Sequence, residues 1–164
     1  MARIKVAVLD AGPIIHLEQI EALRVLTVIR EPKVTEEVCR EVRPHGAGPS
    51  ICTTVPLEGR GKNLAELLVQ RYGLGLGEAS AIALAKQEGI RLLFTDDLEA
   101  REVAMQFELE PHGTLALVVR SFREGVVDRG DALGQISDLH SKSTLYLTAD
   151  LVEWARREVL SYHP

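Results

Sequence analysis

Two short apolar runs, each ending at aspartate, constrain the fold of this 164-residue chain most strongly. The first is "IKVAVLD" at residues 4–10, and the second is "IRLLFTDD" at residues 90–97. Nearly uniform apolar runs of this length are typical of strands that are covered on both faces, as in parallel sheets. Segments with helical spacing lie at residues 62–72, 77–89 and 97–108. The alternation predicts an α/β domain with a mainly parallel sheet.

Further elements are expected outside these segments. A helix beginning near Thr35 would place valines on its buried face. The proline- and glycine-rich segment 43–63 predicts a loop with a short extended piece. A short strand is expected at 109–113, and a helix with a turn at Gly125 is expected at 113–127. The closing segment at 148–160 predicts an amphipathic helix whose apolar side is formed by Leu151, Trp154 and Leu160.

The length fits a single domain, residues 1–164, in which 128–164 form a helical extension packed on the rest. A hydrophobic content of 46% is enough for a real core. The formal net charge of -5 argues against broad, non-specific adhesion to nucleic acid, which needs a basic face. It does not exclude a small acidic site that meets a phosphate backbone through metal ions.

The cysteines and the N-terminal segment bear on the location of the protein. Cys39 and Cys52 share no spacing typical of zinc or redox sites, so a reduced, cytoplasmic setting is expected. Asp10 interrupts the first apolar run, and no apolar stretch is long enough to cross a bilayer. The sequence therefore predicts no membrane association.

Carboxylates stand where the two predicted strands end. In parallel sheets ligands bind beyond the carboxyl ends of the strands, and Asp10, Asp96 and Asp97 fall there. Asp10 equally fits the N-cap of the following helix. Asp96 fits a capping box with Glu99, which leaves Asp97 for another role.

Other acidic residues are less decisive. Glu78 lies in the first turn of a predicted helix, where the helix dipole alone favours a carboxylate. Glu36, Glu37 and Glu41 share one predicted helix, and periodicity does not choose among them. The histidines show no metal-ligand spacing, and we expect His16 to be packed or hydrogen-bonded.

Four segments, in this order, resemble PIN-domain proteins, most closely a prokaryotic subfamily that is similar to the VapC-like toxins of toxin–antitoxin pairs. They are "VAVLDAGPIIHLEQIEALRVL", "VTEEVCREV", "LGLGEASAIALAKQEGIRLLFTDDLEAREVA" and "HGTLALVVRSFREGVV". The resemblance covers nearly the whole chain. It implies a three-layer α/β/α sandwich with a mainly parallel central sheet and with acidic residues gathered over the strand ends.

The resemblance also implies the site residues. It assigns the catalytic positions to Asp10, Glu41, Glu78 and Asp97, and the metal ligands to Asp10, Glu78, Asp97 and the adjacent Asp96. Glu41 is favoured over Glu37 because an aliphatic residue, Val42, follows it.

Two positions depart from the family pattern. Ala11 stands where many relatives carry a hydroxyl residue that supports the first aspartate, and Leu98 follows the doublet where arginine is common. Arg101, one turn further on, is expected to replace that arginine in contacting phosphate. Lys86 and Arg43 are further candidates for substrate binding.

These residues predict a divalent-metal-dependent endoribonuclease. Carboxylate oxygens suit Mg²⁺ or Mn²⁺, and a cation relieves the repulsion among clustered carboxylates. Two such ions would activate water and stabilise the leaving oxygen of an RNA phosphodiester. The toxin resemblance implies a cognate antitoxin as partner and a homodimer.

Two other functions compete with this hypothesis. The chain is alternatively a catalytically inactive PIN-like module that binds RNA or a protein partner. Phosphoryl transfer of the receiver or haloacid-dehalogenase type is disfavoured, because the Asp-x-Asp-x-Thr pattern is absent after Leu9.

Overall fold

The computed structural model describes residues 3–46 and 50–163. Residues 47–49 of the predicted loop lie outside this range. Within the described residues the elements run in the order β1 (Ile4–Leu9), α1 (Ala11–Gln19), η1 (Leu23–Val28), β2 (Ile29–Val34), α2 (Glu36–Val42), η2 (Arg43–His45), β3 (Thr53–Thr54), α3 (Gly59–Tyr72), α4 (Leu76–Glu88), β4 (Leu92–Phe94), α5 (Leu98–Gln106), β5 (Glu110–His112), α6 (Thr114–Arg123), α7 (Arg129–Ser141) and α8 (Ala149–Leu160), where η marks a 3-10 helix.

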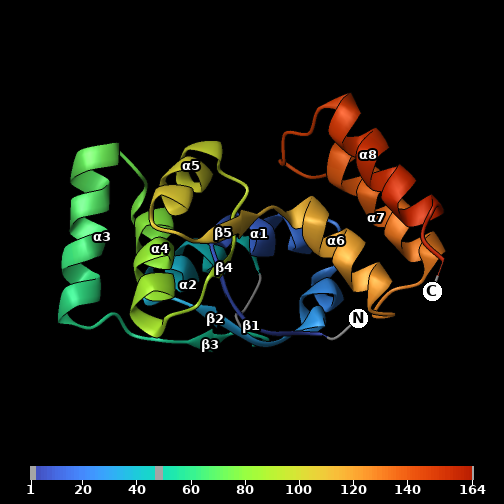
Figure 1. Cartoon of the computed structure of the whole chain (residues 1–164). Helices are drawn as coiled ribbons and strands as arrows, with labels where there is room; N and C mark the ends of the chain where they lie inside the picture. Colours follow the sequence, from blue (N-terminus) through green and yellow to red (C-terminus); the bar gives the residue numbers. More distant parts are fainter. Residues whose placement is uncertain (1–2, 47–49, 164) are drawn as a thin grey trace.

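The five strands form one sheet in the order β3-β2-β1-β4-β5. Every neighbouring pair is parallel. The sheet lies between α3 and α4 on one side and α6, α7 and α8 on the other (Figure 1). The predicted α/β/α sandwich with a parallel sheet is confirmed. All strands therefore end at the same edge of the sheet.

The central strand β1 is the most buried part of the sheet. Ala7, Val8 and Leu9 have no exposed surface. Val8 pairs with Leu93, and Leu9 pairs with Phe94, in β4. The residues that follow β1 and β4 are consequently neighbours in space, although more than 80 positions separate them in sequence.

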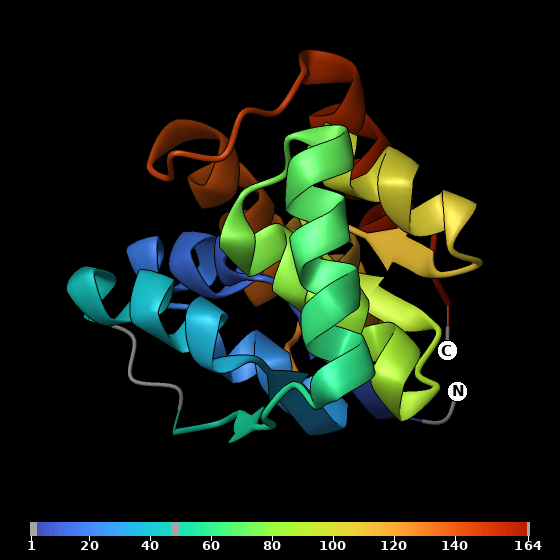
Figure 2. The ribbon, with the colours of Figure 1, turned by 90° about the vertical axis from the view of Figure 1, so that its left-hand side faces the viewer.

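Helix α4 is buried on nearly all sides because the sheet covers one face and α3 covers another. Figure 2 shows α3 lying across α4, and the two helices are in contact. The predicted inward residues Ala81, Ile82, Leu84 and Ala85 are all buried. The helix stops at Gly89, whose φ of 66° is a left-handed conformation that glycine adopts without strain. Both predictions for this segment are confirmed.

The apolar side predicted for α8 is wrong. Leu151, Trp154 and Leu160 are 48%, 40% and 48% exposed, whereas Ala155 and Val159 are buried. Because α8 packs against α6 and α7, close approach favours the smaller residues at the contact. The larger apolar side chains are left on the outer surface.

The sequence signal is weakest for β2, which lies between β1 and β3 in the sheet. Strand β2 was not predicted, because Arg30, Glu31 and Lys33 interrupt its apolar pattern. The short extended piece and the short strand were predicted and appear as β3 and β5. Helix α3 starts at Gly59, earlier than expected. In the described part of the chain, no helix has the length and apolar character needed to cross a membrane.

Helix α7 contributes directly to the core, which gives a test of its coupling to the rest of the fold. Leu139 on α7 has no exposed surface. We expect Leu139→Ala to lower the free energy of unfolding by about 2–5 kcal/mol in a single transition, as for other buried leucines. Chemical denaturation followed by circular dichroism measures this.

Leu160→Ala is the matched control, because Leu160 is half-exposed on the neighbouring helix. Its effect should stay within roughly 0.5 kcal/mol. Separate melting of the C-terminal helices, with an unchanged main transition, would contradict the expected coupling.

Candidate functional site

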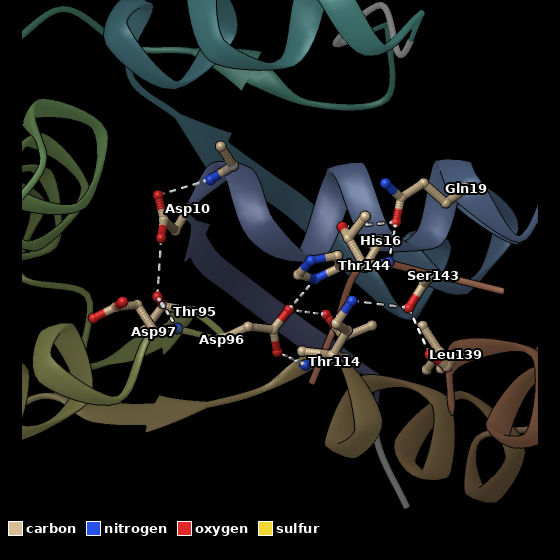
Figure 3. Close-up of polar contacts among 12 residues, drawn as sticks. Asp10, His16, Gln19, Thr95, Asp96, Asp97, Thr114, Leu139, Ser143 and Thr144 are labelled. Atoms are coloured by element: carbon tan, nitrogen blue, oxygen red, sulfur yellow. Dashed lines mark hydrogen bonds and ion pairs between the residues drawn. The ribbon is translucent and has the colours of Figure 1, made fainter. Parts of the chain in front are cut away.

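The end of β1 is joined to the end of β4 through Asp10. The backbone N–H of Asp10 donates to the Phe94 carbonyl at 2.9 Å. Thr95 Oγ1 donates to Asp10 Oδ2 at 2.9 Å, and the Ala11 N–H donates to Asp10 Oδ1 at 2.7 Å (Figure 3). Asp10 is thus the N-cap of α1, and it is only 5% exposed. Capping still leaves lone pairs on both carboxylate oxygens.

Burial raises the pKa of Asp10 from 3.8 to about 7. The hydrogen bonds from Ala11 and Thr95 act in the opposite direction, since they favour the carboxylate. The negative charges of Glu78 and Glu41 raise the pKa further. Asp10 therefore lies in a region where negative charge accumulates.

Asp97 is the N-cap of α5. Its Oδ1 accepts a hydrogen bond from the Ala100 N–H at 2.7 Å. The prediction that Asp96 caps this helix in a capping box with Glu99 is therefore wrong. The helix begins one residue too late for that arrangement, because its first residue is Leu98 and the residue before it is Asp97. Asp97 remains exposed, and its Oδ2 is left for another partner.

Asp96 points in the opposite direction to Asp97 (Figure 3). Its Oδ2 accepts from His16 Nδ1 at 2.7 Å and from Thr114 Oγ1 at 2.5 Å, and its Oδ1 accepts from the Thr114 N–H at 2.7 Å. Burial raises the pKa of Asp96, but the hydrogen bonds from His16 and Thr114 outweigh burial and hold it below its usual value. The side chain ties α1, β4 and α6 together. His16 is hydrogen-bonded, as predicted.

A buried hydroxyl pair fixes α2 against α4. Thr35 Oγ1 lies 2.7 Å from Ser80 Oγ, and Ser80 Oγ donates to the Gly77 carbonyl. This contact brings Glu41 of α2 directly over Gly77 of α4. A Cβ at Gly77 would overlap the Glu41 carboxylate, so glycine is required for this approach.

Glu78 adjoins this contact. Its Oε2 accepts from the Gly75 N–H at 2.8 Å at the start of α4. Burial raises the pKa of Glu78, the Gly75 hydrogen bond opposes this, and the charges of Asp97 and Glu41 raise the pKa again. Glu78 therefore stabilises the start of α4, as its place in the first helical turn predicts. It also lies near the carboxylates of Asp97 and Glu41.

One cavity of about 930 Å³ collects these side chains. Four predicted catalytic residues line it: Asp10, Glu41, Glu78 and Asp97. Asp96, His16 and Arg101 also contribute to its wall. Of the three glutamates of α2, only Glu41 is among the lining residues, whereas Glu36 pairs with Arg40. Glu41 thus differs from Glu36 and Glu37 in its position at the cavity, a difference that periodicity alone does not predict.

The three predicted substrate-binding residues are not together. Arg101 lines the cavity, and its Nε donates to the Thr95 carbonyl at 2.9 Å. Lys86 lines a different cavity and donates to the Phe107 carbonyl at 3.0 Å. Arg43 is exposed in η2 and does not line the carboxylate cavity.

The donor chemistry of the cavity suits a hard divalent cation, because it consists of carboxylate oxygens. Asp97 has one oxygen outside its cap hydrogen bond, and Asp10 is surrounded by carboxylate charge. Across residues 3–46 and 50–163, no three potential ligands converge closely enough to hold an ion in the observed conformations. The donor set fits such an ion in chemical type and in its location within one cavity.

Thr95 and Gly77 were not predicted as site residues. Thr95 supplies a hydroxyl to Asp10, which is the support that Ala11 lacks. Its position directly before the doublet at a strand end was the available signal. Gly77 belongs to a glycine-rich stretch that looked like an ordinary turn, and its contact with Glu41 depends on tertiary packing.

A family model described as PIN domain matches residues 6–160. The chain is a PIN-domain protein. No curated protein and no solved structure matches it. PIN domains are generally nucleases that act on RNA and use divalent metals. The predicted family is confirmed, and the VapC-like subfamily stays a prediction from sequence.

The raised pKa of Asp10 predicts a pH-dependent stability of this PIN domain. Folded Asp10 keeps its proton up to about pH 7, whereas the unfolded chain loses it near 3.8. The free energy of unfolding therefore falls as pH rises between these values. Asp10→Asn removes this loss, so it should stabilise the metal-free protein more at pH 8 than at pH 5. The difference is a few kcal/mol, since one pKa unit corresponds to about 1.4 kcal/mol.

Urea denaturation in a chelator at both pH values measures this difference. Glu37→Gln is the control, because Glu37 does not line the cavity. An equal loss of stability at both pH values in Asp10→Asn would show that the carboxylate is not buried at this position.

Proposed function

We propose that this PIN domain is a divalent-metal-dependent endoribonuclease that hydrolyses RNA phosphodiesters. The observation that carries the proposal is the position of Asp10, Glu41, Glu78 and Asp97 in the wall of one cavity, where burial and the neighbouring carboxylates raise the pKa of Asp10. Such an arrangement is unfavourable for ionised carboxylates unless a cation neutralises them. Cations bound in this cavity would also allow the acidic protein to contact the negatively charged phosphates of RNA.

The carboxylates of the cavity would act as metal ligands. Asp10, Glu78 and Asp97 would hold Mg²⁺ or Mn²⁺, with Glu41 completing the set and Asp96 as a further predicted ligand. When bound, the ions supply activation of water and stabilisation of the leaving oxygen. Donors of the chain orient the carboxylates of Asp10, Glu78, Asp96 and Asp97.

The supporting hydrogen bonds favour Asp97 over Asp96 as a ligand. Both oxygens of Asp96 already accept hydrogen bonds from Thr114 or His16. Asp97 uses only Oδ1 to cap α5, so its Oδ2 is available to a metal ion. Arg101 would contact a phosphate at the rim, because its Nε is fixed by the Thr95 carbonyl. Lys86 and Arg43 would meet an RNA strand only beyond the cavity.

We further propose that the protein is a cytoplasmic toxin that pairs with a cognate antitoxin and forms a homodimer. The support is the resemblance of four ordered segments to VapC-like toxins. Cys39 and Cys52 are free thiols, which suits a reducing compartment. A small DNA-binding protein encoded next to this chain, and its co-purification with it, would test the assignment.

A catalytically inactive module that binds RNA or a protein partner is the second candidate. It is favoured by Leu98, which replaces the arginine common in relatives, and by Glu78, where aspartate is frequent. Binding of RNA without turnover in any divalent metal would support it.

Cleavage of single-stranded RNA tests the proposed function directly. We expect cleavage with Mg²⁺ or Mn²⁺ and none in a chelator. Asp10→Asn, Asp97→Asn and Glu41→Gln should each lower the rate at least about 100-fold, since each removes charge that stabilises the transition state. Gel analysis of end-labelled RNA gives the rate.

Glu37→Gln is the matched control for Glu41→Gln, because both residues lie on α2 and only Glu41 lines the cavity. Its rate should equal that of the wild type. Activity retained in Asp10→Asn and Asp97→Asn would assign the cleavage to a contaminant or to another site.

Gly77 allows a test that leaves every carboxylate in place. Gly77→Ala should force the Glu41 side chain away, because the new Cβ overlaps it. We expect the cleavage rate to fall about 10- to 100-fold, as when the support of a metal ligand is disturbed. Affinity for Mn²⁺, measured by calorimetry, should fall in parallel.

Gly134→Ala is the matched control, since Gly134 also lies in a helix and nothing lies within 4 Å of an added Cβ. It should leave the rate unchanged and stabilise the fold slightly. Equal rates for Gly77→Ala and the wild type would remove Glu41 from the site.

A further inference from the structure

The connection between α7 and α8 forms one wall of the carboxylate cavity. Thr144, Tyr146 and Leu147 of this connection are among the lining residues of the cavity. Gln19 of α1 fixes this connection, because its Oε1 accepts from the Thr144 N–H at 2.8 Å and from Thr144 Oγ1 at 3.1 Å (Figure 3). The wall is thus held in place next to the carboxylates.

Within this wall, side chains alternate between the core and solvent. Leu145 and Leu147 pack against the hydrophobic core, whereas Tyr146 between them is 87% exposed. A tyrosine that stabilised the fold would be expected to bury its ring. Tyr146 instead lies among the lining residues of the cavity with its ring largely exposed, two positions after the anchored Thr144.

A second aromatic side chain lines the same cavity. Trp154 on α8 is 40% exposed, and Leu151, one turn earlier, is 48% exposed. Leu98 of α5 contributes another exposed apolar side chain to the lining. The opening therefore combines carboxylates at one part of the cavity with aromatic and apolar groups at another.

We propose that Tyr146 and Trp154 form a surface that stacks against unpaired nucleobases of an RNA strand bound at the carboxylate site. This inference rests on the proposed nuclease function and assigns it a base-binding surface. Aromatic faces bind bases of any sequence, and bases are available for stacking when they are not paired in a duplex. The charge of the cavity supports this, because Arg101 stands against six carboxylates, those of Asp10, Glu41, Glu78, Asp96, Asp97 and Glu99, and contacts to phosphate are correspondingly few.

The binding mode has a measurable signature. Few phosphate contacts mean that the dissociation constant depends weakly on salt concentration. Affinity should instead depend on the bases, so an abasic strand of equal length and charge should bind poorly.

Trp154 is the single tryptophan of the chain, so its fluorescence reports directly on the proposed contact. The experiment uses the Asp10→Asn protein with Mg²⁺, titrated with oligoadenosine, oligouridine, an RNA duplex and an abasic strand. We expect quenching by the two single strands and little change with the duplex or the abasic strand.

Substitutions separate stacking from general packing. Tyr146→Ala should weaken binding of oligoadenosine at least about fivefold, the lower end for loss of one stacked base. Tyr146→Phe should retain it, because the ring remains. Leu151→Ala should weaken binding, and Leu160→Ala, equally exposed on the same helix but outside the cavity, should not.

Wild-type kinetics provide an independent measurement. Tyr146→Ala should raise KM for a single-stranded substrate by a similar factor. Unchanged binding and KM in Tyr146→Ala, or equal affinity for the abasic strand, would overturn the inference while leaving the nuclease function intact. Base-dependent binding with no cleavage by the wild type would support the inference and reject the nuclease function.

One further outcome assigns the surface differently. A shift of Trp154 emission with protein concentration alone, abolished by Tyr146→Ala, would identify this wall as a contact between two copies. That result would overturn the inference.

Discussion

The parallel pairing of β1 with β4 is the contact on which the site depends. It places Leu9 beside Phe94, so the next residue of one strand, Asp10, meets the hydroxyl of Thr95 at the end of the other. The strands supply the position, and the hydrogen bond supplies the orientation. The carboxylates from α2, α4 and α5 then gather around a group that is already fixed and buried.

Much of this arrangement follows from the sequence, because its determinants are local. Apolar runs ending at aspartates identify β1 and β4, and together they place Asp10 and Asp97 at one edge of a parallel sheet. Helix α4 was predicted in detail because its small and apolar residues leave few alternatives. The family resemblance supplied Glu41, and its place in the cavity agrees with that assignment.

The remainder could not be predicted, because it depends on contacts between distant segments. Whether Asp96 or Asp97 caps α5 is decided by where β4 ends and by hydrogen bonds from His16 and Thr114. The exposed side of α8 is decided by its packing on α6 and α7, and amphipathic spacing alone pointed to the wrong residues. Strand β2 lies inside the sheet, between β1 and β3, but its Arg30 and Glu31 are exposed. These charges interrupt the apolar pattern by which a buried strand is predicted.

The hydrogen bond between Gln19 and Thr144 spans 125 positions of the chain. A ribosome releases the N-terminal segments first, and these begin to fold before the later ones emerge. Asp10, Glu41, Glu78 and Asp97 all leave the ribosome before the wall that contains Tyr146. The carboxylate cavity is therefore closed on that side only after the segment that contains Thr144 has emerged and docked onto α1.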